Sequence, residues 1–169
     1  MSFPLFMEGV KIVSGFNHGL GNAANVADRV SLENYGRVAA LVIINQNAAD
    51  ADTITFHKAT AATAGTEDTA NAIPNWWYME DVTAGTTADT WTKGTAVASG
   101  STIATSATGS GTSFYLIDLG ADELPDTTAN YSFVEINMGG AGPAANFTYI
   151  LYFLYQPRFG QSSLPSAQA

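Results

Sequence analysis

The segment 146–156, Asn-Phe-Thr-Tyr-Ile-Leu-Tyr-Phe-Leu-Tyr-Gln, constrains the fold of this chain most strongly. In an extended strand, successive side chains point to opposite faces, and here both sets are apolar or aromatic apart from Thr148. A strand with one solvated face would alternate apolar and polar residues. We therefore interpret this segment as a central strand of a β-sandwich, with a second face that meets other sheets or other subunits.

A helix is the alternative for this segment, but its many Tyr, Phe and Ile residues favour a strand. The run from Phe147 to Tyr155 has nine residues, whereas a membrane-spanning helix needs about 20 apolar residues. Pro157 lacks the backbone N–H that a strand donates, so we expect the pairing to end there.

The remaining sequence predicts short strands separated by turn-forming residues and no amphipathic helix of useful length. We expect strands at 7–13, 38–44, 52–60, 75–82, 90–98, 102–108, 113–119 and 131–138. A glycine- and asparagine-rich loop is predicted at 14–25, a polar loop at 61–72 and a single turn at 121–124. The expected fold is all-β: a single jelly-roll-like or immunoglobulin-like β-sandwich of eight to ten short antiparallel strands. It should span residues 1–160, followed by a flexible tail or arm at 161–169.

Charged residues make up only 12% of the chain, about half the usual share, and 46% of the residues are hydrophobic. So few charges cannot cover a monomer's surface in the ordinary way, and we expect part of that surface to be buried in an assembly. The alternative is an extracellular β-protein with threonine-rich sheets. The amino-terminal residues lack a basic region followed by an apolar core, so we expect no secretory signal.

The formal net charge of −9 is distributed unevenly. Acidic and basic residues cancel within residues 1–45, which could face a partner while the acidic remainder faces water. No basic patch is present, so neither nucleic acid nor an anionic membrane is an expected partner. The absence of cysteine excludes disulfides, thiolate nucleophiles and zinc–thiolate sites.

Motifs that could carry chemistry are incomplete. The run 19–24 matches a dinucleotide-binding Gly-x-Gly-x-x-Ala pattern, but too few residues follow it to form the required helix, so we interpret it as a turn. His18 and His57 have no spaced partner for metal binding or general base catalysis, and His57 lies on an ordinary polar strand face. The acidic groups at 50–52 and 122–126 offer fewer oxygens than a calcium site needs.

A pair of carboxylates and a group of tryptophans each have both a functional and a structural interpretation. Asp118 and Glu135, on neighbouring predicted strands, could pair as the carboxylates of a glycosidase, although the sequence does not fix their separation. Trp76, Trp77 and Trp91 could form a sugar-binding platform, or they could pack in the core. Since Trp76 and Trp77 face opposite ways in a strand, at least one of them should be a core residue. We assign no catalytic residue, no cofactor and no metal ligand.

Several segments, taken in order, resemble a known family. They are Val30-Ser31-Leu32 with Tyr35 and Val38, Asp52 to Phe56, Trp76-Trp77-Tyr78, Tyr115 to Asp118, Ala121 to Leu124, and Gln156-Pro157-Arg158-Phe159. This order is similar to that of small virion proteins of tailed bacteriophages and prophages, some of which are capsid decoration (cement) proteins. The threonine-, alanine- and glycine-rich stretches at 59–72 and 83–110 depart from the family's pattern.

The resemblance implies an all-β protein bound to the outside of an icosahedral shell, often as a trimer, with the major capsid protein as its partner and no catalytic residues. We therefore expect a non-enzymatic virion protein that stabilises a capsid surface. The alternatives are a tail, fibre or connector-associated domain, or a carbohydrate-binding β-sandwich. The candidate assembly contacts are Lys11, Arg29, Arg37, Tyr152, Arg158 and Phe159.

Overall fold

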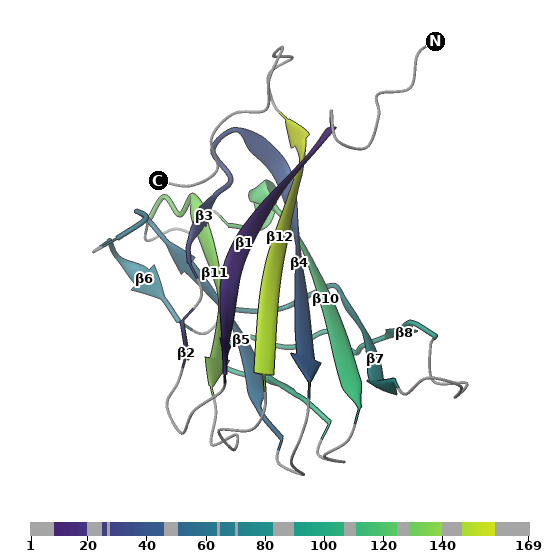
Figure 1. The fold of residues 1–169 in the computed structure, drawn as a ribbon. Coiled ribbons are helices and arrows are strands. Elements are labelled where there is room, and N and C mark those ends of the chain that lie inside the picture. Colours follow the sequence, from purple (N-terminus) through teal and green to yellow (C-terminus); the bar gives the residue numbers. More distant parts are fainter. Residues whose placement is uncertain are drawn as a thin grey trace.

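Two antiparallel sheets pack face to face in a computed structural model of the chain (Figure 1). The structure describes residues 9–19, 25–26, 28–45, 51–63, 65–69, 71–82, 90–106, 111–124, 129–139 and 147–157. Within these ranges the elements are strands, apart from the short 3₁₀ turn η1 (Ala121–Glu123) that follows β10. The expected all-β sandwich is confirmed.

Sheet A has six strands, and every pairing in it is antiparallel. Their order across the sheet is β1 (Val10–Gly19), β12 (Phe147–Pro157), β4 (Tyr35–Asn45), β10 (Thr112–Gly120), β7 (Trp76–Val82) and β8 (Thr92–Lys93). The segment that dominates the sequence, β12, pairs along its length with β1 on one side and β4 on the other. It is an interior strand, as predicted.

Sheet B lies behind sheet A in Figure 1 and is built around two longer strands. Its main order is β2 (Asn25–Val26), β11 (Phe133–Gly139), β5 (Thr53–Ala59) and β6 (Glu67–Asp68). Two further short strands complete it, because β3 (Val30–Ser31) pairs with β11 and β9 (Ile103–Ala104) pairs with β5.

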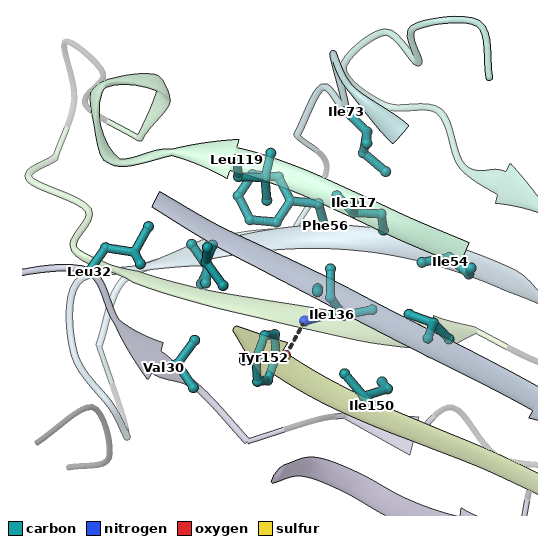
Figure 2. Close-up of a cluster of buried hydrophobic side chains, with 14 of the residues drawn as sticks. Val30, Leu32, Ile54, Phe56, Ile73, Ile117, Leu119, Ile136, Ile150 and Tyr152 are labelled. Carbon is teal, nitrogen blue, oxygen red and sulfur yellow. Dashed lines mark hydrogen bonds between the residues drawn. The ribbon is translucent and has the colours of Figure 1, made fainter. Parts of the chain in front are cut away.

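The core fills the space between the two sheets and takes alternate residues from each (Figure 2). On β12 the inward side chains are Thr148, Ile150, Tyr152 and Leu154, all 0% exposed. Apolar side chains of sheet B, such as Phe56 and Ile136, meet them from the other side. Buried and outward side chains therefore alternate along each strand, as the packing of two sheets requires.

Tyr152 joins the two sheets. Its side-chain oxygen accepts a 3.0 Å hydrogen bond from the backbone N–H of Ile136, drawn as the dashed line in Figure 2. Ile136 lies between the part of β11 that pairs with β2 and the part that pairs with β3. The hydroxyl therefore supplies an acceptor at a gap in the sheet B ladder, where a buried N–H without a partner would be costly.

Tyr152 is thus a core residue in this structure, and its expected role as a surface assembly contact is wrong. Both faces of β12 are apolar in the sequence, so the face that turns inward is decided by the position of sheet B.

The first strand is longer than the sequence predicts. Residues 14–19, placed in a glycine-rich loop, continue β1 along β12 as far as Gly19, with an irregularity in register between Ser14 and Phe16. Gly15 lies in this irregularity, and its backbone oxygen accepts a 2.8 Å hydrogen bond from the N–H of Asp28. The long partner strand β12 provides hydrogen-bonding groups that offset the low strand propensity of glycine and asparagine.

The structure contains twelve strands in its described part, rather than the eight to ten expected. The difference comes from two-residue strands such as β6, which forms inside the predicted loop at 61–72. Arg158, Phe159 and the predicted tail at 161–169 lie outside the described residues. No helix in the described ranges has the length and apolar character needed to cross a membrane.

Candidate functional site

The outward side of sheet A is rich in apolar side chains. Along β12 the outward side chains are half-buried or exposed, with Phe147 at 36% and Tyr149 at 41%. Ile12 on β1 is 43% exposed and lies opposite Phe153. The outer apolar face comprises Ile12, Leu41, Ile43, Trp77, Met79, Trp91, Phe114, Leu116, Phe147, Tyr149, Leu151, Phe153 and Tyr155.

Strand register makes this face continuous. Leu151 on β12 lies opposite Leu41 on β4, which in turn lies opposite Leu116 on β10. Leu116 lies opposite Trp77 on β7, so one apolar row crosses four strands. A parallel row runs through Tyr149, Ile43, Phe114 and Met79. Contiguous apolar surface of this kind marks interaction sites on soluble proteins.

The size of the outward side of sheet A approaches that of a standard interface. The ladders between its five long strands, spaced about 4.8 Å apart, hold nine, ten, nine and five paired positions that rise about 3.3 Å each. These dimensions give roughly 650 Å² for the whole outward side, somewhat below the roughly 800 Å² that each partner contributes to a standard protein–protein interface.

Sheet A carries no formal net charge, although the chain as a whole carries −9. Three basic residues on its strands balance three acidic residues: Lys11, Arg37 and Lys93 against Glu80, Asp81 and Asp118. Lys11 and Glu80 lie on the inward side of the sheet, with buried Leu154 and Tyr115. The described charged residues on the outward side are Arg37, Lys93 and Asp118. A partner that approaches this side therefore meets little of the negative charge that the rest of the chain presents.

Arg37 and Asp118 form a closed polar cluster at one end of the face. The Arg37 guanidinium approaches both carboxylate oxygens of Asp118, at 3.2 Å for Nε–Oδ1 and 3.1 Å for Nη2–Oδ2. The Tyr155 hydroxyl donates to Asp118 Oδ1 at 2.5 Å and accepts from Arg37 Nε at 3.0 Å. Burial, followed by the bond to Asp118, raises the pKa of Tyr155. The hydrogen bond to Asp118 is the main cause of the raised pKa of Arg37.

A hollow of about 420 Å³ opens beside this cluster. It is lined by Ala39, Trp77, Trp91, Leu116, Asp118 and Tyr155. Trp91 is 42% exposed, so its ring is accessible there. Trp76 differs from Trp77, because it packs against the core and its Nε1 donates to the Thr95 carbonyl at 2.7 Å. The adjacent tryptophans therefore face opposite ways, as predicted.

The candidate assembly contacts do not form one group. Arg37 lies on sheet A at the edge of the outer apolar face, and Lys11 lies half-buried on β1. Arg29 instead binds Glu135 and Glu67 on the side of sheet B and is occupied within the chain. The proposed carboxylate pair is also separated, since Asp118 is on sheet A and Glu135 is on sheet B.

Sequence reasoning identified the two-faced character of β12 and named Trp77 and Trp91 as a possible platform, but it missed the residues of β4 and β10 that join them into one face. A signal was available, because Leu41, Ile43, Phe114 and Leu116 also alternate with buried apolar neighbours on β4 and β10. Three adjacent strands that are apolar on both faces indicate that the sheet itself has a second covered side.

No protein-family model matches the chain, and a search of curated proteins gives no match. One solved structure is similar, titled "Structure of infectious bursal disease virus Gt strain", with 4% sequence identity and a TM-score of 0.22. The match covers 95% of this chain and 44% of that chain, so this chain spans less than half the length of its neighbour. A TM-score this low carries no argument about fold or function.

Proposed function

We propose that this chain is a structural virion protein that binds the outer surface of an icosahedral phage capsid and stabilises it. The observation that carries the proposal is the outer apolar face of sheet A, which carries little charge, is continuous and approaches a standard interface in size. The occupant that we assign to this face is the major shell protein, through an uncharged apolar patch on its outer surface. The resemblance to phage decoration proteins supports the same assignment.

Such a protein would act by mass action. A protein that binds the assembled lattice but not the free or ruptured shell protein stabilises the lattice by the free energy of binding. Repetition of the contact over a symmetric shell makes many modest contacts collectively strong. The acidic remainder of the chain would then face solvent and limit further association.

Quantitative mass spectrometry of purified particles tests this function. We expect a copy number close to that of the major shell protein, because a lattice that repeats the shell protein repeats its outer binding site. A handful of copies per particle would instead place the chain at a vertex, tail or connector. Absence from particles would refute a virion role.

A carbohydrate-binding role is the second candidate, and the hollow beside Trp91 favours it. A volume of about 420 Å³ is within the range of small-molecule sites, and its lining combines two indole rings with the carboxylate of Asp118 and the hydroxyl of Tyr155. This reading predicts a change in tryptophan fluorescence when a bound glycan covers Trp91, and Trp91→Ala should abolish that change. An unchanged spectrum across a broad glycan panel would exclude this role.

A further inference from the structure

A second polar cluster, on the side of sheet B away from the core, has no role in the proposed function. His57 on β5 lies directly opposite Glu135 on β11, and Glu67 comes from the adjacent short strand β6. His57 is 6% exposed and Glu135 only 1%, whereas the side chain of Glu67 is 30% exposed. Two members of the cluster are therefore buried, and the third provides access from solvent.

Three side-chain atoms of this cluster converge. His57 Nδ1 lies 2.8 Å from Glu67 Oε1 and 3.4 Å from Glu135 Oε1, and all three atoms lie within 4.8 Å of one another. Ligand atoms around a tetrahedral ion with bonds of about 2.0–2.1 Å are separated by roughly 3.3 Å. Small side-chain movements would thus bring the three atoms around one ion.

Arg29 holds the two carboxylates in this arrangement. Its Nε donates to Glu135 Oε2 at 2.7 Å, and its Nη2 donates to Glu67 Oε2 at 2.6 Å. The guanidinium uses one oxygen of each carboxylate and leaves the other directed toward His57. Contacts of this kind behind the ligands orient them and are typical of protein metal sites.

Thr55 orients the imidazole from its other side. The Thr55 hydroxyl donates to the Asn137 carbonyl at 3.3 Å, so it can only accept from His57 Nε2, which is 3.2 Å away. Carboxylate oxygens only accept hydrogen bonds, so in the metal-free chain Nδ1 also carries a proton, which it donates to Glu67 Oε1 at 2.8 Å. A metal ion bound at Nδ1 would replace that proton, while the proton on Nε2 would keep the ring oriented.

Glu135 Oε1 supplies an independent indication of a ligand. This atom is buried, and its one contact in the described part of the chain is the long ion pair of 3.4 Å with His57 Nδ1, which does not meet hydrogen-bond geometry. A buried carboxylate oxygen so weakly satisfied is costly, and it lies beside both His57 and Glu67. The cluster also combines two carboxylates with only one permanently charged cation, Arg29.

We propose that His57, Glu67 and Glu135 form a three-ligand site for a divalent first-row transition metal ion, with Zn²⁺ the best match. One imidazole nitrogen and two carboxylate oxygens suit these ions, and a water molecule would complete the tetrahedron from the open side next to Glu67. The ion would cross-link β5, β6 and β11 and fasten the short edge strand β6 to sheet B. The site is independent of the outer apolar face.

Calorimetric titration of the chelator-treated, full-length protein with ZnCl₂ near neutral pH tests the site. We expect one Zn²⁺ bound per chain and a rise in melting temperature on binding. His57→Gln and Glu67→Gln should each weaken binding by more than about tenfold, since even the loss of an outer-shell partner costs 10–100-fold. Mg²⁺ and Ca²⁺, which prefer all-oxygen sites with more ligands, should bind much more weakly.

Two matched variants control for binding elsewhere. His18→Gln removes the other histidine of the chain, and Glu33→Gln makes the same acid-to-amide change at an exposed turn. Both should bind Zn²⁺ like the unmodified protein. Glu67→Gln keeps the test valid if His57→Gln fails to fold, because Glu67 is the accessible member of the cluster. Failure of the unmodified chain to bind Zn²⁺, or undiminished binding by Glu67→Gln, would overturn the proposal.

Discussion

Replacing Gly15 with alanine should lower the free energy of unfolding by about 1–3 kcal/mol, the usual cost of overpacking a well-packed core. A Cβ at Gly15 would lie 2.2 Å from Cε2 of Tyr152 and 2.8 Å from its Cδ2. The ring cannot move aside easily, because it is 0% exposed and its hydroxyl is bonded to the N–H of Ile136. At about 2–4 °C per kcal/mol for a chain of this size, thermal denaturation should show a drop of up to about 10 °C.

Gly9→Ala is the matched control. A Cβ at Gly9 meets no atom within 4 Å, so the same substitution there should leave stability almost unchanged. The loss of stability caused by Gly15→Ala should also depend on the aromatic ring of Tyr152. In a Tyr152→Leu background the additional cost of Gly15→Ala should shrink, which a double-mutant cycle measures as a coupling energy. Equal melting temperatures for Gly15→Ala and Gly9→Ala would contradict the close packing of β1 on Tyr152.

Leu151→Lys should abolish attachment to the particle while leaving the fold intact. Leu151 lies on the outer apolar face, between Ser14 on β1 and Leu41 on β4, and begins the apolar row that crosses to Trp77. A lysine there would place an unpaired charge inside a desolvated contact, and a cost of about 2 kcal/mol would lower the affinity about 30-fold. The side chain is only half-buried in the isolated chain, so the melting temperature should change little. Sedimentation of the variant with shells that lack the protein measures the loss.

Thr102→Lys adds the same charge at an exposed position next to β9 of sheet B, and it should bind shells normally. Binding of Leu151→Lys at full occupancy would show that the outer apolar face is not the attachment surface. Analytical ultracentrifugation of the isolated protein distinguishes a further outcome. If the unmodified protein forms a dimer and Leu151→Lys is monomeric, a second copy of the chain covers this face, and the shell protein does not.

The segment 146–156 shows what the local sequence pattern can predict about a strand and what it cannot. Its alternation and its aromatic content correctly predict an interior strand, because these properties depend on neighbours in the chain. Its two side-chain sets are similarly apolar, so the pattern contains nothing that distinguishes the inward face from the outward one. Sheet B makes that choice by packing on the side of Tyr152, and Tyr149 is left 41% exposed on the other side.

The local sequence pattern does not predict the cluster around His57. Arg29 and Glu135 are separated by 106 positions and Arg29 and Glu67 by 38, yet one guanidinium binds both carboxylates. No motif spacing indicates such a site, and His57 therefore looked like an ordinary polar residue on a strand. Only the pairing of β5 with β11 and β6 places these side chains together.

The sequence by itself determined the all-β class, the interior position of its most apolar strand, the opposite orientation of Trp76 and Trp77, and the near-neutral charge of residues 1–45. These follow from side-chain period, turn chemistry and charge order, all of which are local. The tertiary structure alone decided which face of sheet A is covered, where β1 ends, and which charged groups meet across sheet B. The reason is that these outcomes depend on the pairing and packing of strands far apart in the sequence, and alternation along one strand does not specify its partners.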